Sequence, residues 1–228
     1  MAGYQGGLKK IKYSFKKTRL IPGKTPDEEV QKEFIEKILE LKEKSEKKNE
    51  ILLFLDPVHQ MHNNENGYGW QKKGKAGTKK VLSNTGRRRL NIIGALNPVK
   101  IAMTSFITEC KCDREVIKVF FKEIKKDYPG NIKINLILDN ASYNRAYDVQ
   151  ELAEEFNINL IYLPPYSPNL NLIERIWKFF KKETTKNYYY PTFQDFYEAV
   201  DSFFKNFNDF QDELQSLLSF NFEIIKAN

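Results

Sequence analysis

Residues 163–177 read LPPYSPNLNLIERIW, and together with LILDN at 136–140 they decide how the chain folds. Three prolines within five positions interrupt any regular element, and a helical spacing of apolar residues begins after them at Asn169 or Asn171. Glu174 falls in the first turn of this predicted helix, and Asp139 closes an apolar run with the pattern of a buried strand. Two acids at the ends of rigid elements are a way of building a metal site.

A third acid repeats the pattern upstream. The apolar run ILLFL at 51–55 is closed by Asp56 and followed by a proline. A continuous apolar run is expected for a central strand that is covered on both faces. Hard cations such as Mg²⁺ and Mn²⁺ take oxygen ligands. The pattern therefore predicts that Asp56, Asp139 and Glu174 serve such a cation.

These residues carry a resemblance to a known family. The stretch 137–177 resembles the catalytic signature of the mariner-like bacterial insertion-sequence transposases, which belong to the DDE superfamily and have a ribonuclease-H-like fold. The 34 residues between Asp139 and Glu174 match the family spacing, and the PYSP box is the most specific part. The resemblance covers roughly Gly7 to Tyr190. Asn169 and Leu172 stand where the family commonly has an acid and a proline, and neither replaces one of the three acids.

The resemblance implies an activity and a cofactor. Asp56 would bridge two divalent cations, Mg²⁺ or Mn²⁺, while Asp139 and Glu174 would each hold one. The enzyme would cleave double-stranded DNA at the ends of a mobile element and transfer the freed 3′-hydroxyl to target DNA, with TA as the implied target and a homodimer as the implied assembly. A DNA-binding remnant without activity, and another nuclease with the same fold, are the alternatives.

The order of the predicted elements fits the same fold class. Strands come first and then alternate with helices, which predicts an α/β, ribonuclease-H-like domain with a mixed five-stranded sheet flanked by helices. Three parts are expected: a basic arm and amphipathic helix at 1–50, the catalytic domain at 51–190 and a C-terminal helical tail at 191–228. Predicted strands lie at 51–55, 67–70, 89–96, 101–107, 132–138 and 158–162; the predicted helices include one capped by Thr25 with Pro26 at its first position, one capped near Asp113 and one over 146–156.

The composition favours a folded protein of the cytoplasm, associated with the nucleoid. The 228 residues are 41% hydrophobic, enough for one domain with a real core. No 18-residue apolar run or signal peptide is visible, and two cysteines are too few for a disulfide framework.

Positive charge is concentrated in two stretches, although the whole chain has a net charge of only +7. Residues 1–24 hold seven Lys and Arg and no acid, and residues 71–89 hold eight and no acid. Such segregation indicates a polyanionic partner, here DNA. Arg175 and Lys178, beside Glu174, are expected to face phosphate as well. The predicted DNA-binding cations of the second stretch are Lys72, Lys73, Lys75, Lys79, Lys80, Arg87, Arg88 and Arg89.

Polar residues near the acids have weaker assignments. Asn140 orients a metal-bound water or a phosphate, or it makes an Asx-turn. His59 and His62 follow Asp56 closely and either support the acids or are idle loop residues. A zinc site from these histidines with Cys110 and Cys112 is disfavoured, because one residue separates the cysteines rather than two to four.

Members of the family carry helix-turn-helix modules ahead of the catalytic domain. Residues 1–50 contain only one predicted helix, so such a module is expected on a separate chain from another reading frame, or lost through a shortened gene. Phosphate contacts carry no sequence information directly, so the catalytic domain alone is expected to bind DNA with little base readout.

The second basic stretch generates a prediction about salt. Replacing Lys72, Lys73 and Lys75 by alanine should lower the slope of log affinity against log salt by roughly two to three, because each phosphate neutralised releases about 0.9 counterion. The loss should be equal across DNA sequences, and thermal stability should hardly change. Filter binding at several salt concentrations measures the slope. An unchanged slope in the folded triple variant would mean that these lysines are solvated surface residues that do not contact DNA.

Overall fold

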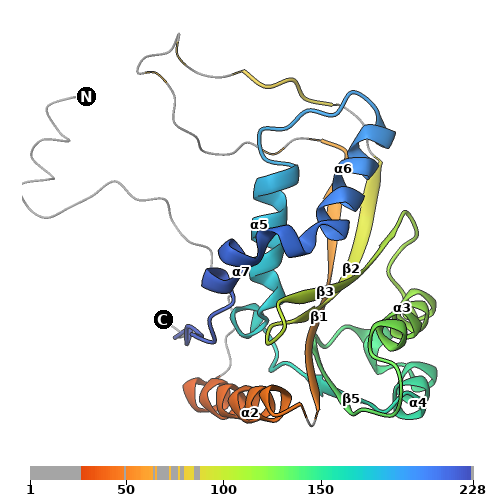
Figure 1. The fold of residues 1–228 in the computed structure, drawn as a ribbon, viewed down its shortest axis with the longest axis vertical. Helices are drawn as coiled ribbons and strands as arrows, with labels where there is room; N and C mark the ends of the chain where they lie inside the picture. The colour runs from red at the N-terminus through yellow and green to blue at the C-terminus, as the bar shows by residue number, and fades with distance from the viewer. Residues whose placement is uncertain are drawn as a thin grey trace, which may run out of the picture.

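The structure is a computed structural model that describes residues 27–48, 50–63, 65, 72, 77, 80–84 and 88–226. These residues form a sheet with helices on both faces (Figure 1). None of the helices within these ranges combines the length and apolar character needed to cross a membrane. In chain order the main elements are α2 (Glu28–Glu46), β1 (Ile51–Met61), β2 (Arg89–Asn97), β3 (Ala102–Thr108), α3 (Arg114–Asp127), β4 (Ile134–Leu138), α4 (Tyr147–Glu155), β5 (Ile158–Tyr162), α5 (Ile173–Thr184), α6 (Phe193–Lys205) and α7 (Gln211–Leu217).

The sheet has five strands in the order β3-β2-β1-β4-β5. The first three strands form an antiparallel meander, while β4 and β5 run parallel to β1 and are reached through helical crossovers. This topology confirms the predicted α/β fold with a mixed five-stranded sheet. It also places β1, which carries Asp56, directly beside β4, which leads into Asp139.

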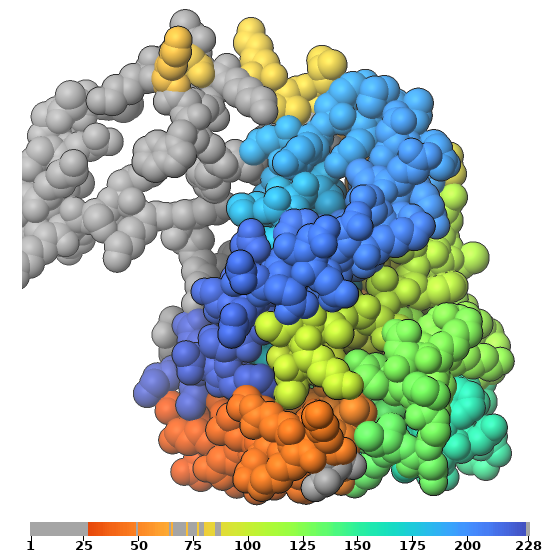
Figure 2. Space-filling model, viewed as in Figure 1, coloured from red at the N-terminus to blue at the C-terminus, as the bar shows by residue number. Residues whose placement is uncertain are grey.

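Alternate side chains along the strands point into two separate hydrophobic cores, one on each face of the sheet. On one face Leu53 and Leu55 of β1 pack with α3 and α4, and on the other Leu52 and Phe54 pack with α2, α5, α6 and α7. The period of two along a strand produces this division, and it explains why β1 reads as a continuous apolar run. In Figure 2 the C-terminal segment (blue) lies directly above α2 (orange), so the two ends of the described chain share one side of the molecule.

Strand β1 is longer than the apolar run predicted. It continues through Asp56 and Pro57 to Met61 and stays paired with β2, whereas its pairing with β4 ends at Phe54. A proline has no N–H to donate, so it is tolerated where one edge of a strand has no neighbouring ladder. The predicted end of the strand at Asp56 was therefore wrong, and this acid lies within a strand.

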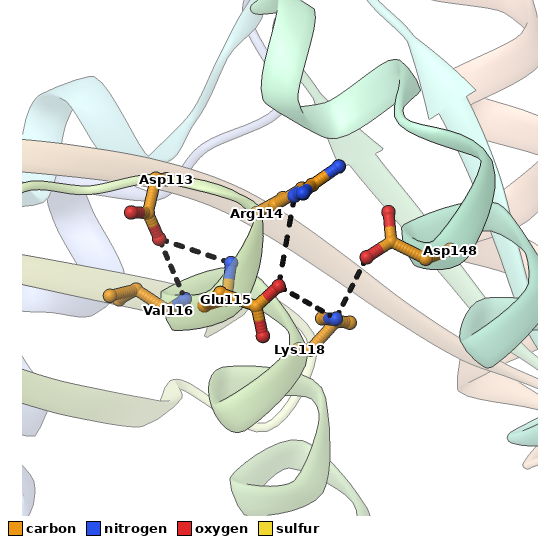
Figure 3. Close-up of polar contacts among 6 residues, drawn as sticks. All are labelled: Asp113, Arg114, Glu115, Val116, Lys118 and Asp148. Carbon is orange, nitrogen blue, oxygen red and sulfur yellow. Dashed lines mark hydrogen bonds and ion pairs between the residues drawn. The ribbon is translucent and has the colours of Figure 1, made fainter.

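The helices α3 and α4 are fixed by side chains at their N-terminal turns (Figure 3). The carboxylate of Asp113 accepts hydrogen bonds from the backbone N–H groups of Glu115 and Val116, which confirms the predicted cap. Lys118 on α3 reaches Asp148 on α4 at 2.7 Å and also pairs with Glu115. These contacts join the two helices that cover one face of the sheet.

Other predicted starts differ in detail. The first helix begins at Glu28 after Asp27, and Thr25 and Pro26 lie outside the described residues, as do the basic arm and the strand predicted at 67–70. Helix α5 begins at Ile173 without a side-chain cap: the side chain of Asn171 donates to the carbonyl of Leu55, and only its backbone carbonyl accepts the N–H of Glu174. Helix α6 has a full capping box from Thr192 and Asp195.

A buried glutamine ties the end of the chain to α2. Gln31 is fully buried, and its amide donates to the carbonyl of Ile225 at 2.8 Å while its carbonyl accepts the Ile225 N–H at 3.0 Å. The same carbonyl accepts a bond from Asn169, in the proline-rich segment before Glu174. One side chain thus connects α2, the C-terminal segment and the loop that leads to α5.

This contact generates a stability prediction. Gln31→Leu should lower the free energy of unfolding by roughly 2 kcal/mol or more, because it strands the buried N–H and C=O of Ile225 without partners. Chemical denaturation measures the loss. Lys32→Leu is the matched control, since Lys32 is the exposed neighbour on the same helix and its replacement should change stability little. Equal effects of the two variants would contradict the assignment.

Candidate active site

The three acids line one pocket of about 470 Å³. Asp56 lies on β1, Asp139 directly follows β4, and Glu174 is in the first turn of α5. The last paired residues of the parallel ladder are Phe54 and Ile137, and each of the two aspartates comes two positions later. Equal offsets from one ladder position place both side chains on the same face and side by side. The rest of the wall comes largely from Asn140 and from residues 163–168.

Asp139 is fixed by its own loop. Its Oδ1 accepts the N–H of Ala141 at 3.1 Å, which forms an Asx-turn, and the amide of the buried Asn144 at 2.8 Å. Both hydrogen bonds go to Oδ1, so they orient the carboxylate and leave Oδ2 available for another ligand. Asn144 was not singled out from the sequence, because nothing local shows that its side chain folds back five residues.

Asp56 is a half-buried acid whose carboxylate accepts a hydrogen bond from the apolar core. Burial, followed by repulsion from Glu174, raises its pKa to about 8, although a hydrogen bond from Trp177 acts in the opposite direction. The indole Nε1 of Trp177 donates to Asp56 Oδ2 at 2.9 Å. The carboxyl of Asp56 is therefore mainly protonated at neutral pH in the free protein. A cation bound beside it would favour the charged form.

Glu174 has a milder environment. Burial raises the pKa of its carboxyl, and the nearby Lys178 and Lys181 oppose the shift. Lys178 is exposed next to the pocket, as predicted for a phosphate contact. Arg175 is used differently: its guanidinium donates to the carbonyls of Leu217, Ser219 and Asn221, so it holds the end of α7 and leaves few donors for DNA.

The loop 163–168 forms the outer wall of the pocket. Tyr166 follows Pro165 and has a φ of 59°, in the left-handed region, and its ring is 60% exposed at the pocket mouth. Asn171, at the inner end, is buried and donates to the carbonyl of Leu55 at 3.2 Å. The proline-rich box thus shapes the pocket as well as ending a strand.

The donor set of the pocket fits a divalent cation such as Mg²⁺ or Mn²⁺. Three carboxylates supply hard oxygen ligands, and repulsion from Glu174 adds to burial, the main cause, in raising the pKa of Asp56. In the described part of the chain no three His, Cys, Asp or Glu side chains stand close enough together to hold an ion by themselves. The three acids therefore line one pocket without forming a closed ligand set, and an ion held there would take further ligands from water and substrate phosphate.

The other predicted polar residues differ in their distance from this donor set. Asn140 lines the pocket beside Asp139, where its amide donates to the carbonyl of Leu163 and its carbonyl accepts from the guanidinium of Arg145, so it braces the pocket wall. The Asx-turn of this loop is made by Asp139, and the contact of Asn140 with a metal-bound water or a phosphate stays a prediction. His59 Nδ1 lies 2.6 Å from Asn91 Oδ1. Strand alternation places His59 on the face opposite Asp56, so a role beside the acids is not supported.

His62 is a packing residue. It is buried, stacks on Phe196 of α6 with ring centroids 5.4 Å apart, and has Nε2 2.9 Å from the carbonyl of Tyr190. Within the described ranges no metal-binding group involves it, so the zinc alternative gains no support. Its position instead fixes the end of β1 against α6.

The basic stretch 71–89 is described only in part. Lys72, Lys80 and Arg89 are exposed, as their predicted role requires. Arg88 pairs with Glu109 at 2.9 Å and its guanidinium lies 3.6 Å from the Phe193 ring centroid, so it also anchors α6. The remaining predicted cations, Lys73, Lys75, Lys79 and Arg87, lie outside the described residues.

Comparison with known proteins identifies the class. Residues 51–197 match the family described as DDE superfamily endonuclease. Because the match spans more than half of the chain, the protein belongs to this family and is an enzyme of the endonuclease class. The resemblance indicated by the 137–177 motif is confirmed at this level.

Two curated proteins are similar over shorter stretches. The uncharacterized protein y4pE/y4sA of Sinorhizobium fredii is 31% identical over 84 residues, which cover 37% of this chain and 60% of that protein. The uncharacterized 39 kDa protein of insertion element IS630 from Shigella sonnei is 28% identical over 123 residues, 54% of this chain and 35% of that protein. The chain therefore spans less than two thirds of either relative.

Solved structures of Mos1 transposase share the fold. The Mos1 paired-end complex with the left transposon end has a TM-score of 0.67 at 13% identity, covering 97% of this chain and 71% of that chain. The mariner Mos1 paired-end complex with Mn has a TM-score of 0.65 at 12% identity, covering 95% and 68%. The structure of the catalytic domain of Mos1 mariner transposase has a TM-score of 0.54 at 9% identity, and the match covers 88% of this chain and 97% of that chain.

The burial of Asp56 generates a pH prediction. A folded-state pKa of about 8, against 3.8 when exposed, means that Asp56 stabilises the fold at low pH and that this contribution is lost as the pH rises through 8. Asp56→Asn keeps an oxygen for the Trp177 N–H and removes the charge. In EDTA this replacement should raise the free energy of unfolding at pH 8 to 9 by on the order of a few kcal/mol, and the melting temperature with it. The gain should be much smaller at pH 5.

Asp148→Asn is the control for this measurement. The hydrogen bond from Lys118 lowers the pKa of Asp148, so this replacement should give no gain at high pH. Scanning calorimetry of both variants from pH 5 to 9 measures the difference. A gain for Asp56→Asn that does not grow with pH would contradict the burial of this charge.

Proposed function

We propose that the protein is the catalytic domain of a transposase that cleaves DNA strands at the ends of an insertion element and joins the freed 3′-hydroxyl to target DNA. The single observation that supports this most is the convergence of Asp56, Asp139 and Glu174 on one pocket from β1, β4 and α5. The family assignment fits the same chemistry. Relatives with DNA and with Mn in their structures favour DNA as substrate and a divalent cation as cofactor.

The proposed roles follow from the shared pocket and from the family resemblance. Asp56, Asp139 and Glu174 would together hold Mg²⁺ or Mn²⁺ ions, and Asp56, whose charge is repelled by both other acids, is the ligand that the resemblance assigns to both ions. Bound cations would offset the charge that develops on the attacking and leaving oxygens of the phosphodiester. Water, or later a 3′-hydroxyl, attacks phosphorus in line; the bond to the 3′-oxygen of the substrate strand breaks, and that oxygen leaves as a hydroxyl after taking a proton.

Residues around the acids serve the substrate. Exposed Lys178 contacts phosphate next to Glu174, and the cations of the stretch 71–89 contact the duplex backbone. Tyr166, exposed at the pocket mouth, offers a ring on which a base or sugar of the reacting strand can pack. A homodimer on DNA, and a separate helix-turn-helix chain that reads the element ends, complete the proposed assembly.

One assay separates this proposal from its alternatives. A labelled duplex with a free 3′-hydroxyl is mixed with supercoiled plasmid and the protein in Mg²⁺ or Mn²⁺. A transposase joins the label covalently to the plasmid; a nuclease of the same fold nicks the plasmid without joining, and a remnant binds DNA but does neither. Joining should vanish in EDTA.

Chemistry and binding should also separate in a variant. Asp139→Asn keeps the Asx-turn acceptor but removes a ligand charge, so it should abolish cleavage in Mg²⁺ while DNA affinity is unchanged or slightly higher, because a charge that repels phosphate is gone. Gel-shift and nicking assays measure the two. Asp201→Asn, remote on α6, should alter neither; equal loss of binding and cleavage in folded Asp139→Asn would refute the division of roles.

A further inference from the structure

We infer that Trp177 is a positioning residue for Asp56: its indole N–H holds one carboxylate oxygen and thereby presents the other to the pocket. This inference rests on the proposed function, since it concerns how a proposed cation ligand is oriented. Trp177 is 3% exposed and donates to Asp56 Oδ2 at 2.9 Å. The indole is buried while Asp56 lines the pocket, so this bond joins the apolar core to the site, and a hydrogen bond in such a partly buried place is stronger than one in bulk water. Among the described residues none donates to Oδ1 of Asp56.

The indole cannot turn away from Asp56. Its ring packs edge-on against Phe180 and Phe204, with centroids 6.4 Å and 6.3 Å apart. An indole nitrogen is only a donor, so a carboxylate is the partner that satisfies it best inside an apolar cluster. The aromatic core between α5 and α6 therefore sets the rotation of a catalytic-site carboxylate.

A glycine makes the approach of the indole possible. Gly94 lies opposite Asp56 in the register of β1 and β2. A Cβ at this position would lie 2.7 Å from Cη2 of Trp177 and 2.2 Å from Cε of Met103, both closer than side chains tolerate. Any larger residue at position 94 would displace the ring from its place over the sheet, so this glycine has a packing role that local sequence does not reveal.

A second contact holds the strand itself. Asn171 donates to the carbonyl of Leu55, the residue before Asp56 and the first beyond the last β4 pair. Asn171 and Trp177 lie three positions before and three after Glu174. The segment that carries Glu174 thus hydrogen-bonds both the backbone next to Asp56 and the Asp56 carboxylate. These two bonds hold Asp56 and Glu174 at a fixed separation in spite of their mutual repulsion.

This arrangement predicts a defect in cation binding. Residues that orient metal ligands typically contribute 10- to 100-fold to metal affinity. Trp177→Phe keeps most of the ring and removes the N–H, so it should weaken Mn²⁺ binding to the full chain by about 10- to 100-fold. Mn²⁺ electron paramagnetic resonance without DNA measures this affinity. The Mg²⁺ concentration for half-maximal cleavage should rise by a similar factor, with a smaller change at saturating Mg²⁺.

Two matched variants separate orientation from packing. Phe207→Leu removes a buried ring of the same cluster that packs on Phe203 and has no ring contact with Trp177, so it should lower thermal stability and leave Mn²⁺ affinity unchanged. Gly94→Ala spares the N–H and displaces the ring, so it should reproduce the Mn²⁺ defect. Equal Mn²⁺ affinity in folded Trp177→Phe and wild type, or an equal loss in Phe207→Leu, would overturn the inference. Absence of Mn²⁺ binding by the wild-type chain would count against the proposed function instead.

A spectroscopic test does not depend on the folding of Trp177→Phe. The sequence has two tryptophans, so Trp70→Phe leaves the Trp177 indole as the only one to be observed. Its ¹⁵N–¹H resonance should exchange slowly with solvent, and Asp56→Ala should shift it and speed its exchange. An indole resonance that is indifferent to Asp56→Ala would also overturn the inference.

Discussion

The parallel pairing of β1 with β4 is the constraint on which the rest of the structure depends. Four consecutive residue pairs, from Ile51 with Ile134 to Phe54 with Ile137, fix the register of two strands that are distant in sequence. Because Asp56 and Asp139 are equally displaced from the last pair, this register determines that they face one pocket. A shift of one residue would move one of them to the opposite face.

Bringing three acids together opposes folding, and the surrounding packing offsets this cost. Burial and mutual repulsion raise the pKa of Asp56 and burial raises that of Glu174, which identifies both as groups whose charged forms are unfavourable in the free protein. The aromatic core of α5 and α6 supplies compensating stability directly behind the site. Sites of this kind commonly trade stability for function.

The sequence revealed what depends on local pattern and missed what depends on tertiary contact. Apolar runs and the proline box were enough to predict the sheet, the crossovers and the three acids. The extension of β1 through Pro57 was missed because it depends on where β4 stops pairing. The carbonyl contacts of Arg175, the pairing of His59 with Asn91 and the burial of Gln31 each join residues more than 30 positions apart, and no local periodicity encodes them.

The contacts of Asn169 link the pocket loop to two segments that are distant from it in sequence. Asn169 bonds both Gln31 and the carbonyl of Glu223, so the loop that ends at Glu174 is closed by segments from opposite ends of the described chain. Loss of the contact between Asn169 and Glu223 would loosen the loop that leads to Glu174 while the strand pairing of the sheet remains, so a local opening reaction could change the order of the pocket without global unfolding.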